Sequence, residues 1–139
     1  MPHLSKHLDL VCPCQAGKSG KLLSFRGCCA KFTLNWPASS APSAADLMRS
    51  RYSAYATNNE AYLLNTWHES TRPQSIELGE DTKWLGLEVK RHVELEESRA
   101  EVEFVARYRI QGKGHRLHEI SQFVRTDGVW YYIDGKMLA

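Results

Sequence analysis

The sequence predicts an α+β domain in which a helical hairpin packs on one face of a curved antiparallel sheet, behind a small cysteine-bearing segment. Apolar residues recur with a helical period between residues 44 and 67, and from residue 83 onward they alternate with a period of two. The joints between the alternating segments are short, which makes consecutive strands antiparallel. Helices followed by such a meander are typical of the α+β class. We expect a cone whose mouth could hold a ligand.

The helical half begins after a stretch rich in Pro, Ser and Ala, residues 35–45, which is typical of a linker. Ser43 and Asp46 form a capping-box-like pair that starts a helix from Ala44 to Thr57. One stripe of this helix, with Arg51 at its edge, consists of Ala44, Met48, Tyr52 and Tyr55. Asn58 and Asn59 end it and can cap a shorter helix from Glu60 to Trp67, whose inward candidates are Leu63, Leu64 and Trp67.

The strand half follows a polar loop from Glu69 to Thr82 that contains Pro73 and Gly79. Asp127-Gly128 is typical of a hairpin turn. The charged stretch Glu94–Arg99 and the flexible stretch Gln111–Gly114 are expected to form the other two joints. The four expected strands are Lys83–His92, Ala100–Gln111, His115–Thr126 and Val129–Asp134.

The composition fits one domain with a small appendage. The chain has 139 residues, of which 42% are hydrophobic and 24% charged. A net charge of +2 is too small to indicate a nucleic-acid or membrane partner through bulk electrostatics. No apolar run approaches the roughly 20 residues of a membrane span, and the N-terminus lacks the apolar region of a signal peptide. We therefore expect a cytoplasmic protein in a reducing compartment.

The four cysteines all lie between Val11 and Lys31. Cys12 and Cys14 form a C-x-C pair, and Cys28 and Cys29 are adjacent. Two tight pairs of soft ligands can close around one tetrahedral zinc ion, with Zn–S bonds of about 2.3 Å. A reducing compartment disfavours disulfides, so zinc is preferred over the alternatives of a disulfide or free thiols. Four thiolates leave no position for water, which makes the ion structural.

The loop between the cysteine pairs carries Lys18, Lys21 and Arg26. These cations could offset the −2 charge of a tetrathiolate zinc centre, remain solvated, or contact phosphate or an acidic protein partner. Leu22, Leu23 and Phe25 are expected to pack this segment against the main domain.

Two sets of residues resemble known families. Cys12-Pro-Cys14, Gly17-Lys18 and Cys28-Cys29 resemble the SEC-C zinc-binding motif. The later blocks are similar to the YchJ family of uncharacterised bacterial proteins: LMRSRYSAY, YLLNTWH, WLGL, FVARY and HEISQFVRTDGVWYYIDG. This resemblance implies a SEC-C zinc-binding segment over residues 1–34, an NTF2-like cone over 35–139, and metal ligands at Cys12, Cys14, Cys28 and Cys29.

The chain departs from the family pattern at three places. Gln15-Ala16-Gly17 stands where the family usually has Gly-Ser-Gly, and the cysteine pairs lie farther apart. Many members also carry a second SEC-C motif after the final strand, and this sequence ends at Ala139 without one. A function that needs two zinc knuckles is therefore not expected unless the protein oligomerises.

The pocket candidates come from both halves of the predicted cone. Arg51 is interpreted either as a brace paired with Glu119 or Asp134, or as a guanidinium offered to an anionic ligand. Glu119 could instead pair with Arg107, and alternation places His118 on the opposite strand face from Glu119. The full set of pocket candidates is Arg51, Tyr52, Tyr55, Trp67, His68, Trp84, Arg107 and Glu119.

Two functions follow from these residues. The first is a non-enzymatic module that binds an unidentified protein partner through the zinc knuckle, with nucleic acid or the ribosome as a weaker alternative. The second is an NTF2-like enzyme or small-molecule binder that uses the cone pocket. An NTF2-like fold hosts both kinds of protein, and the residues assign neither a catalytic group nor an oligomeric state.

Overall fold

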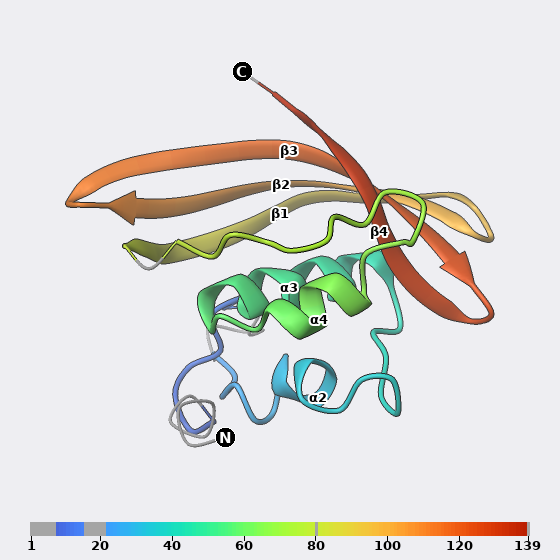
Figure 1. Cartoon of the computed structure of the whole chain (residues 1–139), viewed down its shortest axis with the longest axis horizontal. Helices are drawn as coiled ribbons and strands as arrows, with labels where there is room; N and C mark the ends of the chain where they lie inside the picture. Colours follow the sequence, from blue (N-terminus) through green and yellow to red (C-terminus); the bar gives the residue numbers. More distant parts are fainter. Residues whose placement is uncertain (1–7, 16–21, 80, 139) are drawn as a thin grey trace.

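The computed structural model describes residues 8–15, 22–79 and 81–138. Figure 1 shows three layers: a long curved sheet, the helices α3 and α4 beneath it, and the N-terminal part of the chain with the short helix α2 on the far side of those helices. The α+β prediction is confirmed. In the described part of the chain no helix is long and apolar enough to cross a membrane.

The sheet is a meander of four strands in the order β1-β2-β3-β4, with every neighbouring pair antiparallel. Two of its turns place successive residues in the left-handed region, Gln111 (φ 50°) with Gly112 (φ 81°) and Asp127 (φ 52°) with Gly128 (φ 80°). Such turns match the right-handed twist of the strands that they join. The strand bounds are Thr82–Glu96 (β1), Arg99–Ile110 (β2), Lys113–Thr126 (β3) and Val129–Met137 (β4).

The first strand is longer than the sequence indicates. The charged stretch Glu94–Arg99 was expected to be a joint, but Glu94 pairs with Ala100 and Glu96 with Arg99. Backbone hydrogen bonds continue the ladder there although the side chains are polar, so the hydrophobic pattern ends before the strand does. Register shifts along β1 and one between β3 and β4 act as bulges that curve the sheet.

The long helix α3, Ala44–Ala56, starts where the sequence predicts. The Ser43 side chain accepts a hydrogen bond from the Asp46 backbone N–H at 3.1 Å. Most of this helix is buried, including Ser50 and Ser53, because it lies between the sheet and the N-terminal segment. The predicted stripe is therefore only one of two buried faces.

The second helix, α4, spans Glu60–Asn65 and is capped by the Asn59 side chain as predicted. It ends before Trp67, because the chain there pairs with β4: Trp67 forms a bridge with Tyr132, whose N–H donates to the Thr66 carbonyl at 2.8 Å. Of the residues expected to point inward, Leu63 is fully buried, whereas Leu64 and Trp67 are half-buried.

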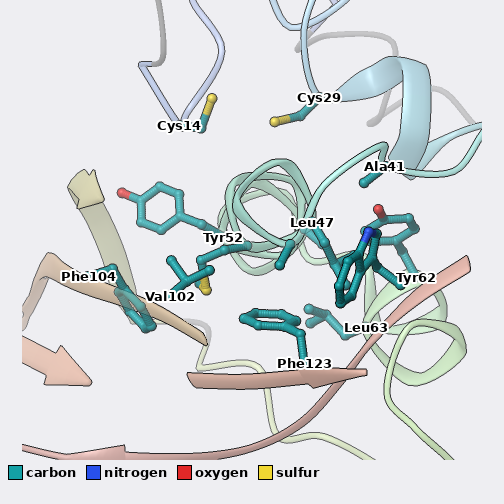
Figure 2. Close-up of a cluster of buried hydrophobic side chains, with 14 of the residues drawn as sticks. Cys14, Cys29, Ala41, Leu47, Tyr52, Tyr62, Leu63, Val102, Phe104 and Phe123 are labelled. Atoms are coloured by element: carbon teal, nitrogen blue, oxygen red, sulfur yellow. The ribbon is translucent and has the colours of Figure 1, made fainter. Parts of the chain in front are cut away.

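The N-terminal segment, defined here as the described residues between 8 and 34, pairs with itself and packs on α3. Val11 bridges Ser24, and α2 (Ala30–Thr33) follows the second cysteine pair. Phe25 is fully buried as predicted, but Leu22 and Leu23 are about half exposed, contrary to expectation. Figure 2 shows Cys14 and Cys29 on one side of α3 and Val102 and Phe123 of the sheet on the other. One buried cluster spans both sides.

Candidate metal centre and cone cavity

The four cysteine sulfurs converge on one point. All four Sγ atoms lie within 4.8 Å of one another, with Cys14 and Cys28 at 3.5 Å and Cys28 and Cys29 at 4.0 Å. A tetrahedral site with Zn–S bonds of about 2.3 Å has S–S edges of about 3.8 Å. All four cysteines are free, so none is held in a disulfide. The donor set fits a metal ion.

Each cysteine pair sits on a tight turn of the self-paired N-terminal segment. The Cys12 N–H donates to the Leu23 carbonyl and the Phe25 N–H to the Leu10 carbonyl, both at 2.8 Å, which joins the two turns. Gln15, at the first departure from the family pattern, adopts the left-handed region with φ 52°. That position therefore accepts a residue other than glycine. The longer loop between the pairs lies largely outside the described residues.

The four thiols differ in exposure and in pKa because they are buried to different extents and lie close together. Cys12, Cys14 and Cys29 are buried, and Cys28 is half-buried. Contact with the Cys14 sulfur lowers the pKa of the Cys12 thiol, whereas contact with Cys12 raises the pKa of the Cys29 thiol. Four thiolates this close repel one another, so a divalent cation is the natural means of stabilising them together.

The cations expected to offset the charge of the centre contribute little in the described part of the chain. Arg26 is largely exposed and pairs with Asp9 at 3.4 Å. Lys18 and Lys21 lie outside the described residues.

A polar group from α3 approaches the centre instead. Ser53 Oγ lies 3.4 Å from Cys12 Sγ, and Ser53 is fully buried. When the sulfur is a metal-bound thiolate, the hydroxyl donates and orients that ligand. Ser53 was not among the site residues predicted from the sequence. The available indication was that Ser50 and Ser53 are three positions apart on the helix face opposite the predicted stripe.

A separate cavity of about 240 Å³ lies between α3 and the concave face of the sheet. Five of the eight predicted pocket residues line it: Arg51, Tyr52, Tyr55, Trp84 and Glu119. Its remaining lining residues are Met48, Phe104, Ala106, Leu117, Ser121 and Tyr132. We call this hollow the cone cavity.

Arg51 is buried, and among the described residues no carboxylate forms an ion pair with it. Its Nη1 donates to the Leu63 carbonyl and to Thr66 Oγ1, each at 2.8 Å. The guanidinium carbon lies 5.1 Å from the centre of the Trp67 ring and 4.6 Å from that of Tyr132. Burial lowers the pKa of Arg51. The predicted brace with Glu119 or Asp134 is wrong, because a carbonyl, a hydroxyl and two aromatic faces hold the cation.

The other three candidates lie outside the cone cavity. Trp67 packs against Arg51 and donates from Nε1 to Thr71 Oγ1 at 3.1 Å. His68 lies in a different hollow, with Nδ1 2.7 Å from Ser70 Oγ. Arg107 is exposed and, in the described part of the chain, forms no ion pair with Glu119. The cavity therefore brings together residues of α3 and all four strands but none from the 67–72 segment.

Glu119 takes a different partner from the one predicted. Its Oε2 accepts a hydrogen bond from Ser121 Oγ at 2.5 Å, and its carboxylate lies over Gly135 of β4. His118 instead contacts Glu103 Oε2 at 2.7 Å. The predicted opposite placement of Glu119 and His118 agrees with these contacts.

The comparisons with known proteins agree with both halves of the structure. Residues 43–135 match the family profile described as "YchJ, middle NTF2-like domain". A UPF0225 protein of a Polaromonas species is 50% identical over 126 residues, which cover 89% of this chain and 91% of the relative. A UPF0225 protein of Chromobacterium violaceum is 50% identical over 135 residues, covering 94% and 95% of the two chains.

Two solved structures share the arrangement. The crystal structure of a SEC-C motif containing protein from Psychrobacter arcticus matches with a TM-score of 0.80 at 27% identity, covering 96% of this chain and 86% of that one. The solution structure of a SEC-C motif containing protein from Rhodopseudomonas palustris matches with a TM-score of 0.74 at 33% identity, covering 86% and 96%.

Proposed function

The chain belongs to the YchJ (UPF0225) family, and on that premise we propose that its N-terminal segment is a structural zinc module that binds a protein partner. The observation that carries the proposal is the convergence of four sulfurs within a small segment that also carries four exposed aliphatic side chains. The cone of the NTF2-like domain supports that surface through α3.

Zinc is the metal that best fits the donor set. Four thiolate donors whose sulfurs lie within 4.8 Å of one another favour zinc, whose filled d shell imposes no geometry other than the tetrahedral one these ligands prefer. A fourfold sulfur shell leaves no open position for a water molecule, so the ion holds the chain in shape and does not activate a nucleophile. Free thiols of this kind persist in a reducing compartment, which supports a cytoplasmic location.

The exposed part of the N-terminal segment includes several apolar side chains. Four aliphatic side chains stand on the two paired segments that carry the cysteines: Leu10 (58% exposed), Val11 (51%), Leu22 (52%) and Leu23 (46%). Single exposed leucines are ordinary, but several on one small paired unit mark an interaction surface. This composition favours a protein partner over nucleic acid or the ribosomal RNA backbone.

A groove next to the metal centre suggests the chemistry of the partner. It has a volume of about 310 Å³ and is lined by Leu23, Cys28, Cys29, Phe32 and Pro42 together with Lys31, Asp46 and Arg49. Asp46 forms an ion pair with Arg49 at 3.6 Å and so partly neutralises it. Among the described lining residues this leaves Lys31 as the cation without an acidic partner. We infer a partner segment with an apolar side chain beside a carboxylate.

Photo-crosslinking in cells tests the proposal. A photoreactive phenylalanine analogue at Leu22 or Leu23 should yield a discrete adduct with one protein. The same analogue at Leu95, an equally exposed leucine on β1, is the matched control and should yield none. Adding Cys14→Ser should abolish the adduct, because the surface loses its support. An adduct that survives Cys14→Ser, equal adducts at all three positions, or no adduct at all would overturn the proposal.

A further inference from the structure

The cone cavity holds a buried cation and a carboxylate that do not pair with each other. We propose that it binds a small zwitterion of the α-amino-acid class with an apolar side chain, independently of the zinc module. The ligand carboxylate would lie against Arg51, its ammonium group against Glu119, and its side chain along the apolar wall.

Arg51 is positioned to receive an anionic group. Nη1 is occupied by the Leu63 carbonyl and Thr66 Oγ1, while Nη2 and Nε make no hydrogen bond to any described residue. The Arg51 side chain lines the cavity although the residue is only 3% exposed. These hydrogen bonds and the two aromatic rings already hold the guanidinium in place. A carboxylate can therefore bind the remaining N–H donors with little further loss of side-chain conformational entropy.

Glu119 is fixed at the same cavity by β3 and β4. It accepts from Ser121 Oγ at 2.5 Å, and a Cβ atom built at Gly135 would collide with its carboxylate. Glycine at this position therefore lets the side chain lie flat across β4. Among the described residues Glu119 forms no salt bridge with Arg51 or with any other cation. Arg51 and Glu119 line one cavity without contacting each other. This leaves room for a ligand that carries a negative group for Arg51 and a positive group for Glu119.

Two phenols add neutral hydrogen-bonding groups near these charges. Burial raises the pKa of Tyr55, and the Arg51 charge partly offsets this shift. Burial, and after it the Glu119 carboxylate, raises the pKa of Tyr132. Both hydroxyls thus remain protonated at neutral pH and can donate to a ligand carboxylate. Together with Arg51 they offer donors to a ligand carboxylate at that end of the cavity.

The rest of the lining is apolar and limits the size of the ligand. Met48, Phe104, Ala106 and Leu117 form the aliphatic and aromatic wall, and Trp84 packs edge-on against Tyr52 at 5.5 Å. A volume of about 240 Å³ is below the range of about 300–1,000 Å³ typical of drug-sized ligands. A second hollow of about 230 Å³ shares Tyr55, Trp84 and Leu117 with it, so space continues beyond these side chains.

Titration of the full chain with L-phenylalanine tests the proposal by calorimetry and by nitrogen-15 NMR. We expect saturable binding with a dissociation constant of about 1 mM or tighter, with shifts at Tyr55, Trp84 and Tyr132. The probes 3-phenylpropionate, which lacks the ammonium group, and 2-phenylethylamine, which lacks the carboxylate, should each bind about 10-fold more weakly. No saturation by about 10 mM, or equal binding of the three probes, would overturn the proposal.

Two variants and one control locate the site. Glu119→Gln keeps the shape of the side chain and should reduce L-phenylalanine binding about 10-fold, to the level of 3-phenylpropionate. Leu117→Trp enlarges a half-buried lining residue and should abolish binding of all three probes. Arg107→Gln, on an exposed side chain, is the matched control and should change nothing. If Glu119→Gln still prefers L-phenylalanine over 3-phenylpropionate, or if Leu117→Trp binds all three probes normally, this assignment is wrong. Loss of zinc or of the protein partner would not affect it.

Discussion

The N-terminal segment and the sheet use opposite faces of α3, and the two faces differ in chemistry. Toward the sheet, α3 presents large side chains such as Met48 and Tyr52, which pack on a broad concave surface. Toward the cysteines it presents Ser53 to a sulfur, and the only large side chain fully buried in the N-terminal segment is Phe25. We therefore expect the sheet side to fold without an ion and the N-terminal segment to depend on one. In a chain this small, a bound metal can stabilise an additional segment that buries too few apolar side chains to fold without it.

The largest difference between the two regions is expected when the metal is removed. A chelator under reducing conditions, or Cys29→Ser, is expected to unfold the N-terminal segment and leave the sheet intact. Structural zinc binding contributes about 10–16 kcal/mol in small zinc domains, far more than the few buried side chains of this segment provide. Hydrogen exchange resolved by mass spectrometry should show lost protection at residues 22–34 and retained protection at 100–126. Equal protection in both regions after metal loss would contradict the account.

Truncating the core on the sheet side should have the opposite effect. Phe123 is fully buried and packs on Tyr132 at 5.8 Å between ring centres. Phe123→Ala is expected to lower the free energy of unfolding by about 3–5 kcal/mol, measured by urea denaturation. The metal content of the folded fraction should stay unchanged. The exposed Leu95 supplies a control, since Leu95→Ala should change stability by less than about 0.5 kcal/mol.

The serine that joins the two regions should affect metal binding more than folding. Ser53→Ala removes the hydroxyl 3.4 Å from Cys12 Sγ and should weaken zinc affinity about 10-fold in a chelator competition. Ser50 is equally buried on α3, but its hydroxyl hydrogen-bonds to Tyr62 Oη at 2.7 Å and to the Leu47 carbonyl rather than to a cysteine. Ser50→Ala should therefore leave zinc affinity unchanged. Identical affinities for the two variants would show that Ser53 does not act on the metal centre.

The smallest expected effect concerns a cap shared by the two regions. The Asn59 side chain accepts from the Tyr62 N–H and donates to the Thr33 carbonyl, each at 3.1 Å. Asn59→Ala should cost about 1 kcal/mol, a loss that Ser43→Ala should match because both are helix caps. Only Asn59→Ala should also increase hydrogen exchange at residues 30–33. If Ser43→Ala does the same, the link through Thr33 is not specific.

The sequence predicted correctly those features of the fold that depend on residues close together in the chain, such as helix caps and turns. The Ser43 cap, the Asn59 cap and the Asp127-Gly128 turn each involve residues within a few positions of one another. The limits of β1 and the end of α4 depend on distant backbone pairing, which side-chain periodicity does not encode. Burial of both faces of α3 was equally hidden, because small polar side chains gave the second face no apolar pattern.

The same difference between local and distant interactions decides which parts of the candidate sites could be predicted. The cysteine pattern predicted four candidate ligands, and the structure brings their sulfurs together, since metal-ligand spacing is a local feature. Arg51 was correctly placed at the edge of the apolar stripe, but its partners, the Leu63 carbonyl and Thr66, could not be anticipated. Main-chain acceptors become available only once α4 ends beside α3, and no side-chain pattern marks them.

X-ray absorption spectroscopy, together with the metal content of protein purified without added zinc, would show whether the four cysteines hold zinc. We expect one zinc ion per chain, surrounded by four sulfur ligands at about 2.3 Å. A folded N-terminal segment without metal, or a zinc shell with fewer than four sulfurs, would contradict it.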